Sequence, residues 1–299
     1  MTTRPASAEL VDSREILPGQ WLQSYHAPTL ASGSRGGQYI QTGRLDLAVG
    51  DGTAGVVGAG SVMRRSFALN TADPATGIVT IHFQGGQRGA RWLTRLRPGD
   101  VADLFGPYGR PFEVDPRSQH LLIVAEGPAI GGVRMLIDEA IRAGRRVTLL
   151  FGATSAEDVY PSTLLPDEVE YVVATQDGSL GHHGTVTELV VDYEAWADQM
   201  FACGPMATLT TLAQFAGGRR ERLGVAKLGR KRGAGKPVPA GSPAARRKAF
   251  LQVSLEQEIG CALGACLGCV VMSTSGAPQR VCREGPVFAS EEIAWEGAW

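Results

Sequence analysis

The sequence predicts a multidomain protein of the β plus α/β class, and three observations support this. Residues 10–116 contain short segments in which apolar and polar residues alternate, separated by turn residues. Residues 117–218 alternate continuous apolar runs with helical patterns. Residues 250–299 hold four of the five cysteines. We therefore expect an antiparallel β-barrel over 10–116, an α/β domain over 117–218 and a small C-terminal domain over 250–299, with a basic linker over 219–249.

Composition excludes several classes of protein. The net charge of −1 does not favour nucleic-acid binding. No apolar run reaches the roughly 18 residues that span a bilayer, and the first residues, MTTRPASAEL, contain no secretory signal. Five cysteines in such a chain favour a metal or catalytic use over disulfides. We expect a cytoplasmic protein that contacts no membrane.

The barrel is predicted from alternating segments. RLDLAV (44–49) and GIVTIHF (77–83) alternate with period two, and no convincing amphipathic helix lies between them. MRRSFALN (63–70) places Arg64 and Arg65 at the start of a further strand. Arginine at this position suits a phosphate-bearing cofactor, because its guanidinium group donates two parallel hydrogen bonds. A solvated strand end explains these arginines equally well.

The α/β domain is predicted from its order of elements. HLLIVA (120–125), RRVTLLFGA (145–153), VEYVVAT (169–175) and QMFACG (199–204) read as buried parallel strands. Helices are expected over 131–144, 184–191 and 205–216, the first with an apolar face formed by Val133, Leu136, Ile137, Ala140 and Ile141. This pattern indicates a doubly wound sheet.

Two turns of this domain lie at the ligand edge of the predicted sheet. AEGPAIGGV (125–133) can offer backbone N–H groups to a dinucleotide pyrophosphate, although tight packing explains its glycines as well. FACGPMATL (201–209) places Cys203, Gly204 and Pro205 at a strand end. A lone cysteine such as Cys203 is more often a core residue.

The cysteine spacing is the most specific feature of the sequence. Cys261, Cys266, Cys269 and Cys282 form the pattern C-x4-C-x2-C-x12-C, whose first part is the plant-type spacing for a [2Fe–2S] cluster. Small residues between these cysteines allow the backbone to approach an inorganic core. Structural zinc is the alternative, but zinc sites usually pair their cysteines in two short knuckles.

Residues 219–249 are strongly basic. They contain eleven Lys and Arg residues and one acid, with much Gly, Pro and Ala. We expect a flexible tether. Contact with an acidic partner or with nucleic acid is the alternative, but no aromatic residues are interleaved for base stacking.

The order of these parts resembles the electron-transfer subunit of dihydroorotate dehydrogenase B, within the ferredoxin reductase superfamily. The resemblance covers nearly the whole chain, and CALGACLGCVV followed by RVCREGPVF is its most specific part. PGQWLQ, LFGPYGRPFEV, TQDGSLGHHGTVTELV and FACGP also match.

The resemblance implies FAD on the barrel, NAD(H) at the α/β domain and a [2Fe–2S] cluster held by the four cysteines. The implied FAD-binding positions are Arg65, Ser66, Phe67, Ala68, His82, Phe83, Gln84, Gly89 and Ala90. The implied NAD-binding positions are Gly127, Gly131, Gly132, Cys203, Gly204 and Pro205. Proline and serine are usual in the family at positions 66 and 68, arginine at 84 and threonine at 90. Glu126 stands where the family has a glycine, in an anion-binding turn.

The chemistry explains why all three groups belong together. NADH gives two electrons as hydride, a cluster accepts one, and a flavin can mediate between them. In the family the electrons pass to or from an FMN-containing dihydroorotate dehydrogenase catalytic subunit, which oxidises dihydroorotate to orotate in pyrimidine biosynthesis. The resemblance implies a heterotetramer of two plus two subunits, in which this chain contributes no catalytic residue toward dihydroorotate.

Two alternatives follow from the same residues. The chain can be the reductase subunit of another NAD(P)H-linked iron–sulfur complex, of the hydrogenase or ferredoxin transhydrogenase type. It can also be a flavin-less redox-sensing relative, which the residues found at Ser66, Ala68, Gln84 and Ala90 motivate.

Overall fold

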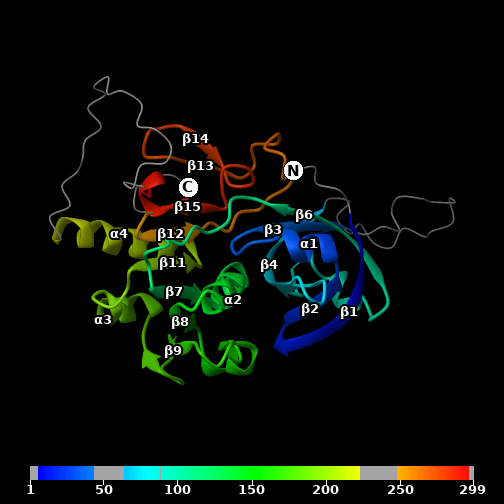
Figure 1. The fold of residues 1–299 in the computed structure, drawn as a ribbon, viewed down its shortest axis with the longest axis horizontal. Coiled ribbons are helices and arrows are strands. Elements are labelled where there is room, and N and C mark those ends of the chain that lie inside the picture. The colour runs from blue at the N-terminus through cyan, green and yellow to red at the C-terminus, as the bar shows by residue number, and fades with distance from the viewer. Residues whose placement is uncertain (1–5, 44–63, 88, 223–247, 296–299) are drawn as a thin grey trace.

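The computed structural model describes residues 6–43, 64–87, 89–222 and 248–295. Within these residues the chain forms a closed barrel beside a layered α/β domain (Figure 1). The expected strand over 44–49 lies outside the described residues. No helix in the described ranges is long and apolar enough to cross a membrane.

The barrel has the strand order β1-β2-β5-β4-β3-β6, and all its pairs are antiparallel. Its strands are β1 (Ala6–Leu17), β2 (Gln20–His26), β3 (Tyr39–Gly43), β4 (Arg65–Asp73), β5 (Ile78–Gln84) and β6 (Val101–Tyr108). A short helix, α1 (Pro28–Gly33), follows β2. Side chains such as Ile40, Leu69 and Ile81 are fully buried in one apolar cluster, as alternation along each strand predicts.

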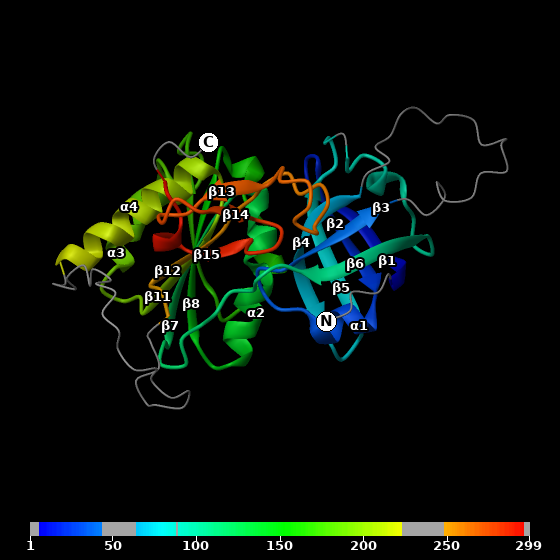
Figure 2. The same cartoon turned by 90° about the horizontal axis from the view of Figure 1, so that it is seen from above.

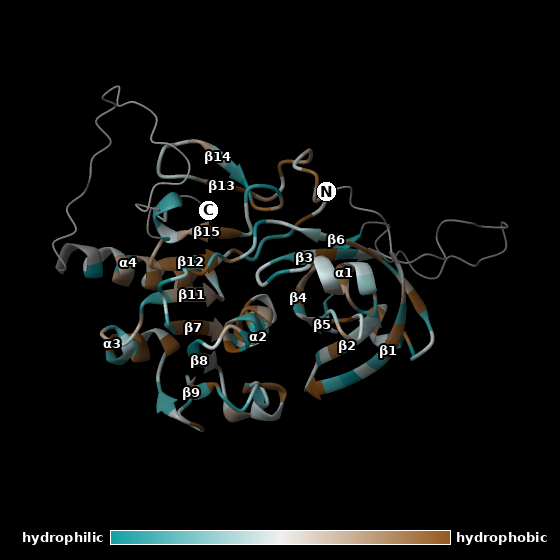
Figure 3. Ribbon diagram, viewed as in Figure 1, coloured by the Kyte–Doolittle hydropathy of each residue, from teal (hydrophilic) through white to brown (hydrophobic). Residues whose placement is uncertain are grey.

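The α/β domain is built on a seven-stranded sheet of order β10-β9-β8-β7-β11-β12-β15. The strands are β7 (His120–Glu126), β8 (Arg146–Ala153), β9 (Glu170–Thr175), β10 (His182–His183), β11 (Gln199–Cys203), β12 (Leu251–Ser254) and β15 (Val287–Ala289). Only β15 runs antiparallel to its neighbour. Figure 3 shows that the central strands are predominantly apolar, which parallel strands covered on both faces require.

Helices cover both faces of this sheet. Leu136, Ile137 and Ala140 of α2 (Arg134–Arg142) pack with Leu121 and Ile123 of β7 in one apolar cluster. The alternate β7 residues, Leu122 and Val124, share a second cluster with Leu209, Leu212 and Ala216 of α4 (Met206–Arg222). The expected helix over 184–191 is present as a 3-10 turn, Val186–Leu189, followed by α3 (Val190–Tyr193). The expected doubly wound architecture is therefore confirmed.

The C-terminal segment is joined to this sheet instead of standing apart. β12 pairs with β11 and β15 pairs with β12, so the residues before and after the cysteines complete the α/β sheet. Between them, β13 (Val270–Met272) and β14 (Pro278–Arg280) form a small hairpin. The prediction of a linker from residue 219 is wrong for its first residues, because α4 continues to Arg222. Residues 223–247 lie outside the described residues.

Candidate functional site

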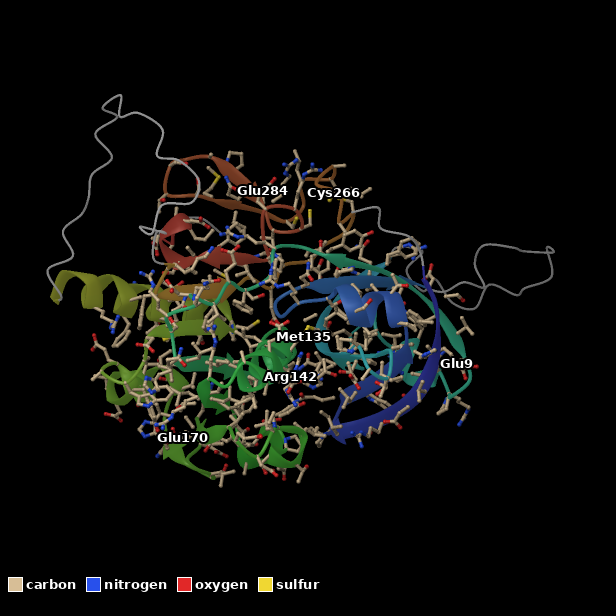
Figure 4. All side chains as sticks on the ribbon, in the orientation of Figure 1. Glu9, Met135, Arg142, Glu170, Cys266 and Glu284 are labelled. Atoms are coloured by element: carbon tan, nitrogen blue, oxygen red, sulfur yellow. The ribbon has the colours of Figure 1, made fainter. Side chains whose placement is uncertain are left out.

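The cysteine loop lies at the surface between the two larger units. Figure 2 shows this loop, between β12 and β13, extending over the barrel. Cys266 lies on its outer side and is exposed, whereas Cys269 and Cys282 are buried and Cys261 is partly buried (Figure 4). One side of the cysteine set therefore faces solvent, and the other side faces the protein.

Backbone N–H groups point at the sulfurs, as a cluster site requires. The N–H groups of Leu263 and Cys266 donate to Cys261 Sγ at 3.4 and 3.5 Å, and that of Cys282 donates to Cys269 Sγ at 3.4 Å. These donors lower the pKa of Cys261 to about 6. Burial and, to a smaller extent, the neighbouring Cys269 together raise the pKa of Cys282 to about 12.

The loop reaches this shape through left-handed backbone. Ala262, Gly264 and Leu267 have φ values of 53°, 76° and 57°. This conformation is uncommon among non-glycine residues, and the loop uses it at both Ala262 and Leu267. Its repeated use within a few residues indicates a loop whose shape suits a bound group. Arg280 donates to the carbonyl of Gly264 at 3.3 Å and is itself paired with Glu284, which ties the loop to the β13–β14 hairpin.

The four thiols form two pairs that lie near each other, since Cys261 also raises the pKa of Cys282. Cys261 contacts Cys266, and Cys269 contacts Cys282. No three His, Cys, Asp or Glu side chains in the described ranges are arranged to hold a single metal ion. A mononuclear zinc site needs its ligands around one point, whereas the two irons of a [2Fe–2S] cluster can each take one pair. The donor set therefore fits a [2Fe–2S] cluster.

The predicted FAD positions lie along β4, β5 and the turn that follows β5. Arg65 begins β4, and its Nε is buried without a hydrogen-bond partner. Gly89 packs directly on this side chain, because a Cβ at residue 89 would lie 2.2 Å from Arg65 Nε. A buried guanidinium nitrogen without a partner is costly, so a ligand phosphate fits the site.

His82 is a second buried group, and the backbone of Pro128 beside it is poorly aligned for a hydrogen bond. Its side chain is 5% exposed, and neither ring nitrogen has a hydrogen bond that satisfies the usual geometry. Burial lowers its pKa to about 4, so the imidazole is neutral at pH 7. The ring lies against the edge of Tyr160, and a Cβ on Gly131 would contact His82 at 3.5 Å. His82 thus connects the barrel to the turn after β7.

The remaining FAD positions differ in what they contact. Phe67 and Phe83 meet edge to face with ring centroids 5.6 Å apart. Ala90 is buried, and Gln84 is exposed and accepts a hydrogen bond from Gln87. Ala68 pairs with Tyr39 across the β3–β4 ladder. Ser66 donates to the carbonyl of Ile259 at 3.3 Å, so this hydroxyl contacts the segment before the cysteines.

The two predicted NAD segments meet at the carboxyl edge of the parallel sheet. A Cβ on Gly132 would lie 2.7 Å from Cys203 Sγ, and one on Gly204 would lie 3.4 Å from Glu126 Cβ. Gly127 has a φ of 56° and opens the 3-10 turn, while Pro205 precedes α4. Thr208 Oγ1 donates to the Glu126 carboxylate, which brings a negative charge to this edge. Glu126 therefore disfavours a pyrophosphate beside its carboxylate.

Cys203 and Glu256 connect this edge to the cysteine loop. Cys203 is buried, and its Sγ lies 3.9 Å from Glu256 Oε1. Burial raises the pKa of the Cys203 thiol, and the neighbouring Glu256 carboxylate raises it further. Glu256 itself is exposed to solvent. Glu256, Tyr39 and Gln41 were not predicted as site residues; only their nearness to matched motifs could have indicated them.

The fold and this arrangement define the class: a barrel joined to an α/β domain, with a four-cysteine segment added at the C-terminal end, and known proteins share both features. Residues 256–294 match the family model for the iron-sulfur cluster binding domain of dihydroorotate dehydrogenase B. The chain is also similar in fold to an NADH-dependent reduced ferredoxin-NADP oxidoreductase, with a TM-score of 0.74 and 21% identity, over 98% of this chain and 91% of that one. A ferredoxin NADP+ reductase from Neisseria gonorrhoeae with bound FAD and NADP aligns at a TM-score of 0.55 and 14% identity, over 70% and 89% of the two chains.

In amino-acid sequence, the chain is similar to electron transfer subunits of dihydroorotate dehydrogenase B (NAD(+)). The subunit from Desulforamulus reducens is 27% identical over 290 residues, which cover 94% of this chain and 95% of the relative. The subunit from Bacillus caldolyticus is 29% identical over 79% of this chain and 81% of its own length. The resemblance and the fold class predicted from the sequence are confirmed.

Proposed function

We propose that this chain is an electron-transfer subunit that carries electrons between NAD(H), FAD and a [2Fe–2S] cluster. The observation that carries the proposal is the loop with four cysteines, in which backbone N–H groups donate to the sulfurs of two thiol pairs. A bound flavin accepts a hydride and releases electrons singly, which suits a one-electron cluster. The protein's own part is to hold these groups close together and to leave one side of the cluster exposed.

Each group has residues that would hold it. Cys261, Cys266, Cys269 and Cys282 would bind the cluster, and Arg65 and His82 would hydrogen-bond the flavin. Gly132, Cys203 and Gly204 would line the nicotinamide side at the carboxyl edge of the sheet. The segments 10–116, 117–218 and 250–299 are proposed to be the corresponding FAD, NAD and cluster units.

We propose that the partner is an FMN-containing dihydroorotate dehydrogenase catalytic subunit in a two-plus-two assembly, in the cytoplasm. The names of the relatives support this partner. None of the five cysteines, all of which lie in the described residues, forms a disulfide, which is typical of a reducing compartment. VVM (270–272) and GPVF (285–288) flank the cysteines, but Val271, Val287 and Phe288 are buried, so these side chains pack in the core instead of facing a partner. The exposed apolar residues beside the cysteines are Leu263 and Leu267.

Cofactor analysis of the purified chain tests the proposal. We expect about two irons and two sulfides per chain, as a single [2Fe–2S] cluster requires, together with bound flavin. Cys266→Ser should abolish the cluster's visible absorption and stop the export of single electrons, while NADH still reduces the flavin. Cys203→Ser is the control for the cluster's absorption alone, because Cys203 is a buried thiol outside the loop. NADH reduction is not compared in this control, since Cys203 belongs to the proposed nicotinamide site. One zinc without sulfide would disprove the cluster, and a chain that binds no flavin after reconstitution would favour the redox-sensing alternative.

A further inference from the structure

Barrel strand β3 contacts both ends of the cysteine segment. Tyr39 Oη donates to the carbonyl of Cys282, the last cysteine, at 2.9 Å. Gln41 Nε2 donates to the carbonyl of Gly260, directly before the first cysteine, at 3.1 Å. Both side chains are 4% exposed. These contacts join residues more than two hundred positions apart in the sequence, so only the fold brings them together.

The geometry of a strand explains how one element reaches both ends. Tyr39 and Gln41 are two residues apart on β3, so their side chains leave the same face of the strand roughly 7 Å from each other. The residue between them, Ile40, points the other way and is fully buried in the barrel. The outer face of β3 therefore fixes the distance between the start and the end of the cysteine segment.

β4 adds a third contact and connects this face to the flavin positions. Ser66 lies opposite Gln41 in the β3–β4 ladder, receives a hydrogen bond from it at 3.3 Å and donates to the carbonyl of Ile259 at 3.3 Å. Arg65 lies next to Ser66 and opposite Thr42. The strand that carries the proposed flavin-binding arginine thus carries a contact to the cysteine segment at the following residue.

We propose that Tyr39, Gln41 and Ser66 are positioning residues that hold the cluster-binding segment against the flavin-binding strands. This inference rests on the proposed function, because it assigns to the three side chains the task of fixing the distance between flavin and cluster. Two hydrogen-bonded strands are stiffer than a loop, so a cluster anchored to β3 and β4 keeps its separation from a flavin bound on β4. The same contact explains serine at position 66, since a proline there has no hydroxyl to donate.

The test compares Tyr39→Phe, Gln41→Leu and Ser66→Ala with the wild type and with Tyr25→Phe. Tyr25 is the matched control, because its hydroxyl is buried in the same barrel and donates to Gln23, away from the cysteine segment. Gln41→Glu is a second comparison of nearly equal size, since a carboxylate has no N–H to donate to Gly260. All variants are made in the full chain and reconstituted with iron, sulfide and FAD.

Two measurements distinguish positioning from general stability. The first is the rate at which an iron chelator bleaches the cluster, which needs no turnover. We expect Tyr39→Phe and Gln41→Leu to lose the cluster about fivefold faster than wild type, the factor that corresponds to about 1 kcal/mol for one lost hydrogen bond. The second is stopped-flow mixing of Tyr39→Phe and Gln41→Leu with NADH, in which flavin bleaching should keep its rate while cluster reduction slows. Ser66→Ala is compared in the first measurement alone, because position 66 is also an implied FAD-binding position.

The outcomes separate this inference from the proposed function. Variants that match wild type and Tyr25→Phe in both measurements would overturn the positioning role while leaving the cofactor assignment intact. Equal slowing of flavin and cluster reduction, with Tyr25→Phe behaving alike, would also overturn it, because it would indicate general destabilisation. A wild type that takes up no cluster would overturn the proposed function and this inference together.

Discussion

At the scale of single residues, Arg64 and Arg65 show how neighbouring arginines receive different environments. Arg64 forms an ion pair with Asp103 at 2.5 Å, and its guanidinium group lies 3.7 Å from the centre of the Phe105 ring. Arg64 Nη1 keeps this ion pair although its hydrogen-bond geometry is poor, whereas Arg65 Nε is buried without a hydrogen-bond partner. Alternation along a strand sends adjacent side chains to opposite sides, so only one of the two remains available to a ligand.

This difference predicts the flavin affinity of two matched variants. Arg65→Ala should raise the dissociation constant for FAD by about tenfold to a hundredfold, the cost of losing a hydrogen bond to a charged group. Arg64→Ala should leave the affinity near that of wild type, because Arg64 is already paired within the protein. Titration of the flavin-free protein with FAD, followed by fluorescence, measures both. Equal affinities in the two variants would refute the role of Arg65.

At the scale of elements, the barrel meets the α/β domain through β4, β5 and the 3-10 turn after β7. His82 of β5 lies in this contact beside Gly131 and Tyr160. Burial lowers its pKa from the usual 6.5 to about 4. Between these two values the unfolded chain binds a proton at His82 and the folded chain does not. Folding stability should therefore fall as the pH drops from about 6.5 to 4.

The expected effect can be measured on the flavin-free chain. A pKa shift of this size corresponds to a loss of at most about 3 kcal/mol across that pH range. His82→Gln removes the titrating group, so its unfolding temperature should vary less with pH than that of wild type. His26→Gln is the control, because His26 is exposed on β2 of the same barrel. Identical pH profiles for wild type and His82→Gln would show that His82 is not buried in its neutral form.

At the scale of the whole molecule, the residues predicted to bind NAD(H), FAD and the iron–sulfur cluster lie next to one another. Gly131 contacts His82, Gly132 contacts Cys203, and Cys203 contacts Glu256, which precedes the cysteine loop. The loop then turns Cys266 toward solvent. This order leads from the interior to the surface, which suits a subunit that passes electrons to another protein.

The order predicts what the chain can do alone. With NADH it should reduce artificial one-electron acceptors, but it should not interconvert dihydroorotate and orotate. Orotate formation with NAD as the acceptor should require an FMN-containing dihydroorotate dehydrogenase chain as well. The assay compares each chain separately with the reconstituted pair. Orotate formation by this chain alone would overturn the assignment, and an inactive pair with all cofactors present would point to another reductase partner.

The sequence by itself determined the fold class, and it predicted which four cysteines would bind a cluster. Buried parallel strands such as β7 require unbroken apolar runs, and barrel strands such as β5 require alternation, so both can be read from local order. The spacing of Cys261, Cys266 and Cys269 is likewise local, because one loop supplies three ligands to one inorganic group.

Only the tertiary structure decided how these parts are joined. β12 and β15 enter the α/β sheet, and Tyr39 and Gln41 hold the cysteine segment from a distant strand. The sequence pattern neither marked β12 as a strand nor indicated which strand lies beside it. Strands can pair in a sheet whatever their separation in the sequence. The sequence also could not show that Arg65 Nε and the His82 ring nitrogens lack well-aligned hydrogen-bond partners, since this depends on the packed surroundings and not on residue type.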